Sequence, residues 1–165
     1  MSIAVTTQPL RATGRTTARA ADLAGRWLSR HSVSLLRLSL GLVFLAFGAL
    51  KFFPGLSPAE HIAGTTVEML TFGLVPGRAA VVLVAAMETF IGLSLITGRL
   101  RRTGLAVLGV ALTGILSPLV LLPGELFYAD TFTPNLTGQY VLKDIVLVAA
   151  GLVVAGKALT PRGAR

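Results

Sequence analysis

The sequence predicts an all-α membrane protein, with four transmembrane helices in an up-down bundle and a short outer-surface helix. Of its 165 residues, 53% are hydrophobic and 13% are charged, and the mean hydropathy is +0.77. A soluble domain carries about a quarter charged residues. The chain therefore lacks the polar surface of a soluble enzyme, and it is too apolar to be disordered.

Four apolar segments have the roughly 20 residues that a helix needs to cross a bilayer. None alternates apolar and polar residues like a strand, and in hydrocarbon a helix satisfies its backbone groups within its own segment. Arg37 and Lys51, near the ends of the first segment, can extend to the head groups. The segments, which together make residues 33–159 a transmembrane domain, are 35–53, 77–97, 104–122 and 139–159.

Residues 1–32 are expected to be a basic tail on the cytoplasmic side, largely disordered or interfacial. They contain five arginines and one acidic residue, which favours contact with anionic lipid head groups. A short interfacial helix over residues 19–30 and an organellar transit peptide stay open as alternatives. Residues 160–165 are expected to form a second cytoplasmic tail.

The distribution of lysine and arginine predicts the orientation in the membrane. Basic residues occur in the first tail, at 99–102 and from 157 onward, whereas 54–76 and 123–138 contain none. Because cytoplasmic loops carry the excess of Lys and Arg, we expect both termini to lie in the cytoplasm. The chain is then a multi-pass protein of the inner (plasma) membrane. The net charge of +8 then reflects orientation, and no nucleic-acid partner is expected.

The connection at 54–76 is expected to contain the outer-surface helix. Ser57, Pro58 and Glu60 have the spacing of a capping box, with serine at the N-cap and glutamate at N3. The apolar residues that follow suit a helix lying on the outer leaflet. His61, in its first turn, is expected to be solvated.

Ionisable residues within the apolar segments form the predicted site. Glu88 lies eleven residues past Gly77, about 16 Å along a helix and near the bilayer centre. A charge at that depth costs about 2.5–3.5 kcal/mol, so it needs a partner, and Lys143 is close enough to approach it. The expected polar cluster consists of Lys51, Glu88, Gln139, Tyr140, Lys143 and Asp144.

Two interpretations of this cluster stay open. It either holds the helices together or binds a head group, a proton or a small solute. Pro118 cannot donate to the Gly114 carbonyl, so the third span should bend there. Ser117 then either faces a cavity or bonds back to its helix, and Ser117, Pro118 and the loop residue Glu125 are the expected cavity rim.

Small residues recur at positions suited to close helix packing. This pattern indicates a tight bundle and is compatible with a homo-oligomer. The residues are Gly41, Gly48, Gly92, Gly109, Gly114, Gly151 and Ala155.

The residue inventory excludes several kinds of chemistry. With no cysteine and two histidines, the chain cannot form disulfides or Cys-ligated metal centres, and no metal or covalent cofactor is expected. Phosphate-binding loops and nucleophile elbows do not occur in the sequence. No catalytic residue is identified, so the chain is not expected to be an enzyme by itself.

Five motifs occur in an order and spacing typical of one group of small membrane proteins. They are GLVFLAFGALKF at 41–52, TFGL at 71–74, ETFIGLSLITGR at 88–99, LSPLVLLPGE at 116–125 and GQYVLKD at 138–144. Over about residues 33–158, the chain thereby resembles the DoxX/DoxD-like superfamily of four-helix inner-membrane proteins. It looks most similar to the DoxX-family and RclC (YkgB)-like branch.

This resemblance implies a role in membrane redox chemistry or in defence against oxidative stress. It implies an accessory subunit of an oxidoreductase that binds quinone or lipid, lies in the lipid bilayer and meets a soluble redox partner. It brings no catalytic residue with it. A small-solute or proton-coupled transporter and a purely structural scaffold are the alternatives.

Overall fold

The structure, a computed structural model, describes residues 10–99 and 101–160. Within those residues it has eight α-helices and one isolated bridge, between Phe127 and Pro134, so the all-α prediction is confirmed. The chain divides into two compact units, Met1–Leu35 and Leu36–Arg165. The candidate site lies entirely within the second.

Helix α1 (Leu10–Lys51) begins in the first unit. Its side chains from 19 to 32 are exposed, and the Trp27 ring stacks on His31 with centroids 5.0 Å apart. The structure thus gives an α-helix from Leu10 onward where a largely disordered or interfacial tail is expected; an interfacial position of this helix stays a prediction, and residues 1–9 lie outside the described part. The physical reason is composition, because most of 18–30 is Ala, Arg and Leu, the stronger helix formers.

Three described helices are long and apolar enough to cross a membrane: Arg19–Lys51, Gly77–Thr97 and Arg102–Leu121. They account for the first three predicted spans. The fourth, 139–159, is divided by a turn at Asp144 into α7 (Leu136–Lys143) and α8 (Ile145–Leu159). Neither part has the length of the other three, so a fourth crossing stays a prediction.

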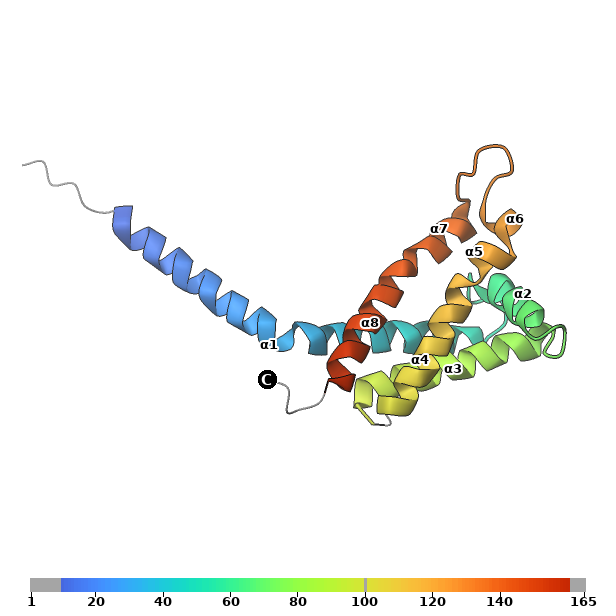
Figure 1. Ribbon diagram of the computed structural model, residues 1–165, viewed down its shortest axis with the longest axis horizontal. Helices are drawn as coiled ribbons and strands as arrows, with labels where there is room; N and C mark the ends of the chain where they lie inside the picture. The colour runs from blue at the N-terminus through green and yellow to red at the C-terminus, as the bar shows by residue number, and fades with distance from the viewer. Residues whose placement is uncertain (1–9, 100, 161–165) are drawn as a thin grey trace, which may run out of the picture. The chain divides into compact units, whose positions relative to one another are not determined.

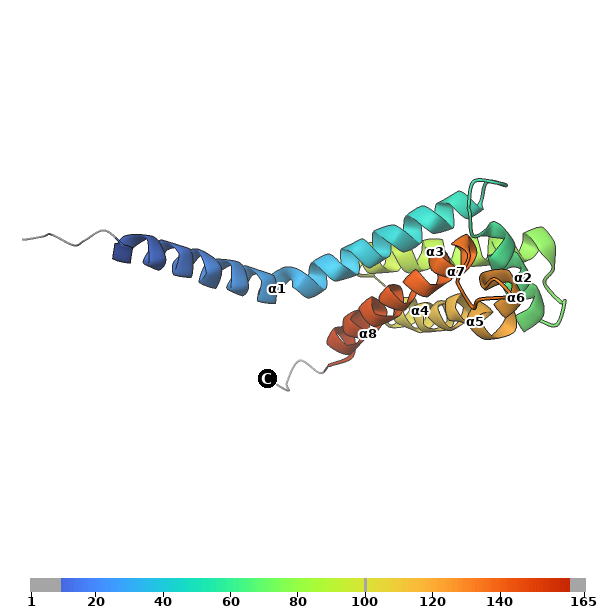
Figure 2. The same ribbon diagram turned by 90° about the horizontal axis from the view of Figure 1, so that it is seen from above.

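The main core of the second unit lies between the later part of α1, α3 (Gly77–Thr97), α4 (Arg101–Leu116) and α8. Figures 1 and 2 both show α3 and α4 side by side. Apolar side chains from all four helices meet there, and burial of this area is the main stabilising contribution. The buried members are Leu40, Phe44, Ile91, Leu95, Leu108, Leu112 and Val154.

Glycines bring α1 and α3 into backbone contact. A β-carbon on Gly92 would lie 2.6 Å from the Leu45 nitrogen, and one on Gly41 would lie 3.1 Å from the Gly92 oxygen. The packing role predicted for these glycines is confirmed. Gly109 and Gly114 make no such contact within the described chain, because an added β-carbon there would meet nothing within 4 Å.

A second, smaller core lies beside the connections that follow α1 and α4. It joins α2 (Glu60–Leu70), α5 (Pro118–Leu121), α6 (Pro123–Leu126) and α7. Its buried residues are Ala59, Ile62, Leu126 and Val141. The helix predicted within the connection at 54–76 is therefore present as α2, and it is packed against its neighbours; its outer-surface location stays a prediction.

The predicted capping box of α2 is wrong. The N-cap is Ala59, without a side-chain cap, and the Ser57 hydroxyl is buried without a hydrogen-bond partner among the described residues. The Glu60 carboxylate instead accepts from Gly55 N at 2.7 Å and from Arg78 Nη1 at 3.0 Å. Charge-assisted bonding to an arginine is stronger than a cap bond to a neutral amide.

Candidate functional site

Lys51 and Glu88 form a buried ion pair between α1 and α3. Lys51 Nζ donates to Glu88 Oε2 at 2.6 Å, and their side chains are 3% and 9% exposed. Mutual attraction is strong in such a low-dielectric surrounding, whereas either charge alone would be costly there. The partner of Glu88 is thus Lys51 and not Lys143.

The ion pair lies in the wall of a cavity of about 830 Å³. This volume falls in the range of about 300–1,000 Å³ typical of ligand pockets, which are mostly apolar with a few polar groups. Most of the wall is aliphatic or aromatic, with Phe44, Phe47 and Met87 among its larger side chains. The polar side chains in it are Lys51, Thr66, Thr71, Glu88, Thr113, Ser117, Tyr140, Lys143 and Asp144.

Helix α7 and the turn that follows it contribute three of the predicted polar residues to this cavity. The Tyr140 ring packs edge-on against Phe47, with centroids 6.1 Å apart. Asp144 is half-buried at the turn between α7 and α8 and lines the same cavity as Glu88 and Lys51. Lys143 is exposed, and among the described residues no carboxylate lies within ion-pair distance of it.

Two predicted residues lie away from the cavity. Gln139 is exposed, and its Nε2 donates to the Pro134 carbonyl at 3.3 Å. Glu125, expected at the rim, lies with its Oε2 3.1 Å from Nε2 of the exposed His61. Neither residue lines the cavity. Glu125 is in the first turn of α6, and its side chain is directed towards His61 of α2.

Pro118 interrupts the third span as the sequence predicts. Helix α4 ends at Leu116 and α5 begins at Pro118. Ser117 Oγ donates to the Gly114 carbonyl at 2.7 Å, which satisfies the acceptor that proline cannot serve. Ser117 therefore bonds back to its helix and also lines the cavity with Pro118.

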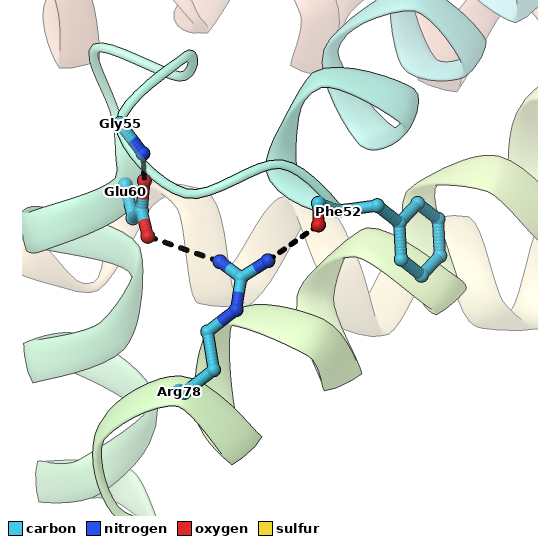
Figure 3. Close-up of polar contacts among 4 residues, drawn as sticks. All are labelled: Phe52, Gly55, Glu60 and Arg78. Carbon is cyan, nitrogen blue, oxygen red and sulfur yellow. Dashed lines mark hydrogen bonds and ion pairs between the residues drawn. The ribbon is translucent and has the colours of Figure 1, made fainter.

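The structure adds Arg78, which no motif in the sequence marks as a functional residue. From the first turn of α3, its Nη1 donates to Glu60 Oε1 at 3.0 Å and its Nη2 to the Phe52 carbonyl at 2.6 Å (Figure 3). It thereby ties α3 to the end of α1 and the start of α2. The available signal was an arginine directly after a connection, 54–76, without Lys or Arg.

Comparison with known proteins gives one family. The family model described as DoxX matches residues 32–121, more than half of the chain. No curated protein and no solved structure matches the chain. The matched segment contains both members of the buried ion pair together with Ser117 and Pro118, and it ends before α7.

Proposed function

Because the chain belongs to the DoxX family, we propose that this integral membrane protein is an accessory subunit of a membrane redox system that binds a quinone between its helices. The single observation that carries the proposal is the apolar cavity in its membrane part, with the Lys51–Glu88 ion pair in the wall. An intramembrane ionisable pair that lines a cavity is by default a functional-site hypothesis.

The polar groups of this cavity suit the head group of a quinone. Quinone carbonyls accept hydrogen bonds, and the Lys51 ammonium and the Tyr140 hydroxyl are donors. The apolar wall suits an isoprenoid tail. A bound quinone supplies two-electron, two-proton redox chemistry. The chain's own part is to orient the head group through Lys51 and Tyr140 and to hold protons at the Glu88 and Asp144 carboxylates.

The proposed role includes a soluble redox partner and an inner-membrane location with both termini in the cytoplasm. The sequence has no cysteine and therefore no thiol that could carry electrons, and in the proposed role a soluble partner supplies electrons to the quinone. The orientation follows the Lys/Arg distribution. In this orientation Arg78 lies on the side of the membrane opposite the termini. This is compatible with the excess of basic residues on the cytoplasmic side, because the ion pair with Glu60 neutralises the charge of Arg78.

Quantifying bound quinone after native purification tests the proposal. The double variant Lys51→Met/Glu88→Gln removes both charges and so leaves no unpaired buried ion. Its matched control is Glu68→Gln, an exposed acid on α2 outside the cavity wall. We expect quinone to copurify with the wild type and the control and to be lost from the double variant. Recovering only bulk phospholipid with the wild type would refute quinone binding.

The buried ion pair also supports a second candidate, proton-coupled transport of a small solute. In that case, proteoliposomes containing the wild type would show solute flux that disappears in Glu88→Gln and persists in Glu68→Gln. If neither bound quinone nor flux is found, the cluster is a structural scaffold. Copurification of oxidoreductase subunits would favour the redox role over transport.

A further inference from the structure

We propose that ligands reach this cavity sideways from the lipid, through a portal between α4 and α7–α8 formed by Val110, Thr113, Lys143 and Val146. In this portal Lys143 is the residue that first receives the polar head of the ligand. The identity of the ligand rests on the proposed quinone-binding function. The portal itself is inferred from the exposure of its lining residues, the depth of Thr113 along the membrane-crossing segment and the charge of Lys143.

The cavity wall divides into a buried interior and an exposed mouth. Lys51, Glu88 and most other lining residues are buried or half-buried. The exposed lining residues are Leu70, Val110, Thr113, Lys143 and Val146. All but Leu70, the last residue of α2, lie on α4 and on α7–α8, and Val110 and Val146 are 65% and 70% exposed. The cavity therefore reaches the surface between these helices.

The mouth lies at the depth of the hydrocarbon. Thr113 is eleven residues past Arg102, where the membrane-crossing segment Arg102–Leu121 begins. At 1.5 Å per residue this is about 16 Å, near the middle of a hydrocarbon layer roughly 30 Å thick. Val110 lies one turn nearer to Arg102. A ligand that enters here comes from the lipid and not from water, so it is a lipophilic molecule whose tail can extend through the mouth among the acyl chains.

The charge at the mouth indicates the polar end of that ligand. Lys143 is exposed and has no carboxylate partner among the described residues. Its neighbour Asp144 projects about 100° away around the helix. An unpaired ammonium at membrane depth is costly, and an oxygen acceptor on the ligand removes that cost. The ligand is therefore an amphiphile with a carbonyl or carboxylate head and a long apolar tail, as in an isoprenoid quinone or a fatty acid.

Spin labelling tests the portal without any ligand. Because the sequence has no cysteine, Met87→Cys places one nitroxide in the cavity wall on α3. Collisions with oxygen, which concentrates in hydrocarbon, are compared with collisions with a water-soluble nickel chelate in liposomes. We expect the label to collide with oxygen and not with the chelate.

Adding Val146→Trp should reduce the oxygen collisions, because the indole fills the mouth. The matched control is Leu152→Trp, an exposed position (67%) on the same helix and outside the cavity wall, which should change nothing. Collisions with the nickel chelate, or equal effects of the two tryptophans, would overturn the portal.

Binding of two probes tests Lys143 and distinguishes the two sources of the head group. A long-tailed quinone and a long-chain fatty acid are titrated into wild type, Lys143→Met and the control Lys157→Met, which changes an exposed lysine in the last turn of α8. We expect about tenfold weaker binding to Lys143→Met, the loss of one hydrogen bond to a charged group, with no change for Lys157→Met.

The probe that shows this loss identifies the head group. Equal affinities of wild type and Lys143→Met for both probes would contradict the role of Lys143. If the wild type binds the fatty acid and no quinone, the quinone proposal fails while the spin-label result still supports the portal.

Discussion

Gly48 places the backbone of α1 directly against Glu88: a β-carbon on Gly48 would lie 2.9 Å from the Glu88 β-carbon. Lys51 follows less than one turn later, so its ammonium meets the carboxylate and not the head groups. This explains why Lys51, expected to extend to the membrane surface, is 3% exposed. The glycine contact and the ion pair are parts of one helix crossing.

Enlarging that glycine should separate the two helices. Gly48→Ala puts a methyl group 2.8 Å from the Thr89 backbone nitrogen, and backbone cannot yield as a flexible side chain can. We expect a loss of about 1–3 kcal/mol, measured by unfolding in detergent. Gly109→Ala, where nothing lies within 4 Å, is the control and should be neutral or slightly stabilising. Equal destabilisation by both substitutions would show that the close contact between α1 and α3 does not determine the loss of stability.

The ion pair should behave as a unit. Lys51→Met or Glu88→Gln alone leaves one buried charge without its partner and should cost about 3–5 kcal/mol. The double variant should cost less than either single one, because it leaves no lone ion. Glu68→Gln, at an exposed position, should stay within about 0.5 kcal/mol. The unfolding free energies of the wild type, the two single variants and the double variant give the coupling energy, and an additive double variant would mean that the pair contributes nothing as a pair.

Arg78→Ala should loosen the connection between α1 and α2. It removes the donors to Phe52 O and Glu60 Oε1 (Figure 3), and Glu60, no longer held, also releases the Gly55 amide. Because this site is partly exposed, we expect a loss of only about 1 kcal/mol, together with faster hydrogen exchange at Gly55. Arg102→Ala, which changes another exposed arginine, should leave that exchange rate unchanged. An unaltered exchange rate at Gly55 in Arg78→Ala would contradict the proposed role of Arg78 in holding Glu60.

Asn135 should be the main cap of α7. Its Oδ1 accepts from Gly138 N at 2.9 Å, and its Nδ2 donates to the Glu125 carbonyl at 2.8 Å. Asn135→Ala loses both bonds and should cost about 1–2 kcal/mol. Asn135→Asp keeps the acceptor, adds a favourable charge at the helix N-terminus and should cost less. Melting temperatures rank the two variants, and equal losses would place the effect in the Glu125 contact alone.

Sequence reasoning was reliable where the signal is local. The segment predicted at 77–97 is the helix Gly77–Thr97, because mostly apolar residues run between two local stop signals, Pro76 before the helix and the left-handed Gly98 after it. The interruption at Pro118 was predicted for a similarly local reason, the missing N–H of proline.

It was unreliable where distant residues compete for one partner. Glu60 was assigned to a cap on Ser57, but Arg78, 18 positions along the chain, binds it. Lys143 was expected to approach Glu88, but Lys51, 37 positions away, pairs with it. Spacing along one helix says which residues share a face, and it does not say towards which neighbour that face is turned.

The order of residues determines that the chain lies in a membrane, that its regular structure is helical and approximately where the first three spans begin and end. These properties depend on hydropathy and helix propensity, which are summed over neighbouring residues. Which charges meet and where the cavity opens follow from the crossing of the helices. That crossing depends on how closely Gly48 and Gly92 let α1 approach α3, and a close approach of two backbones is a property of the packed bundle and not of either helix alone.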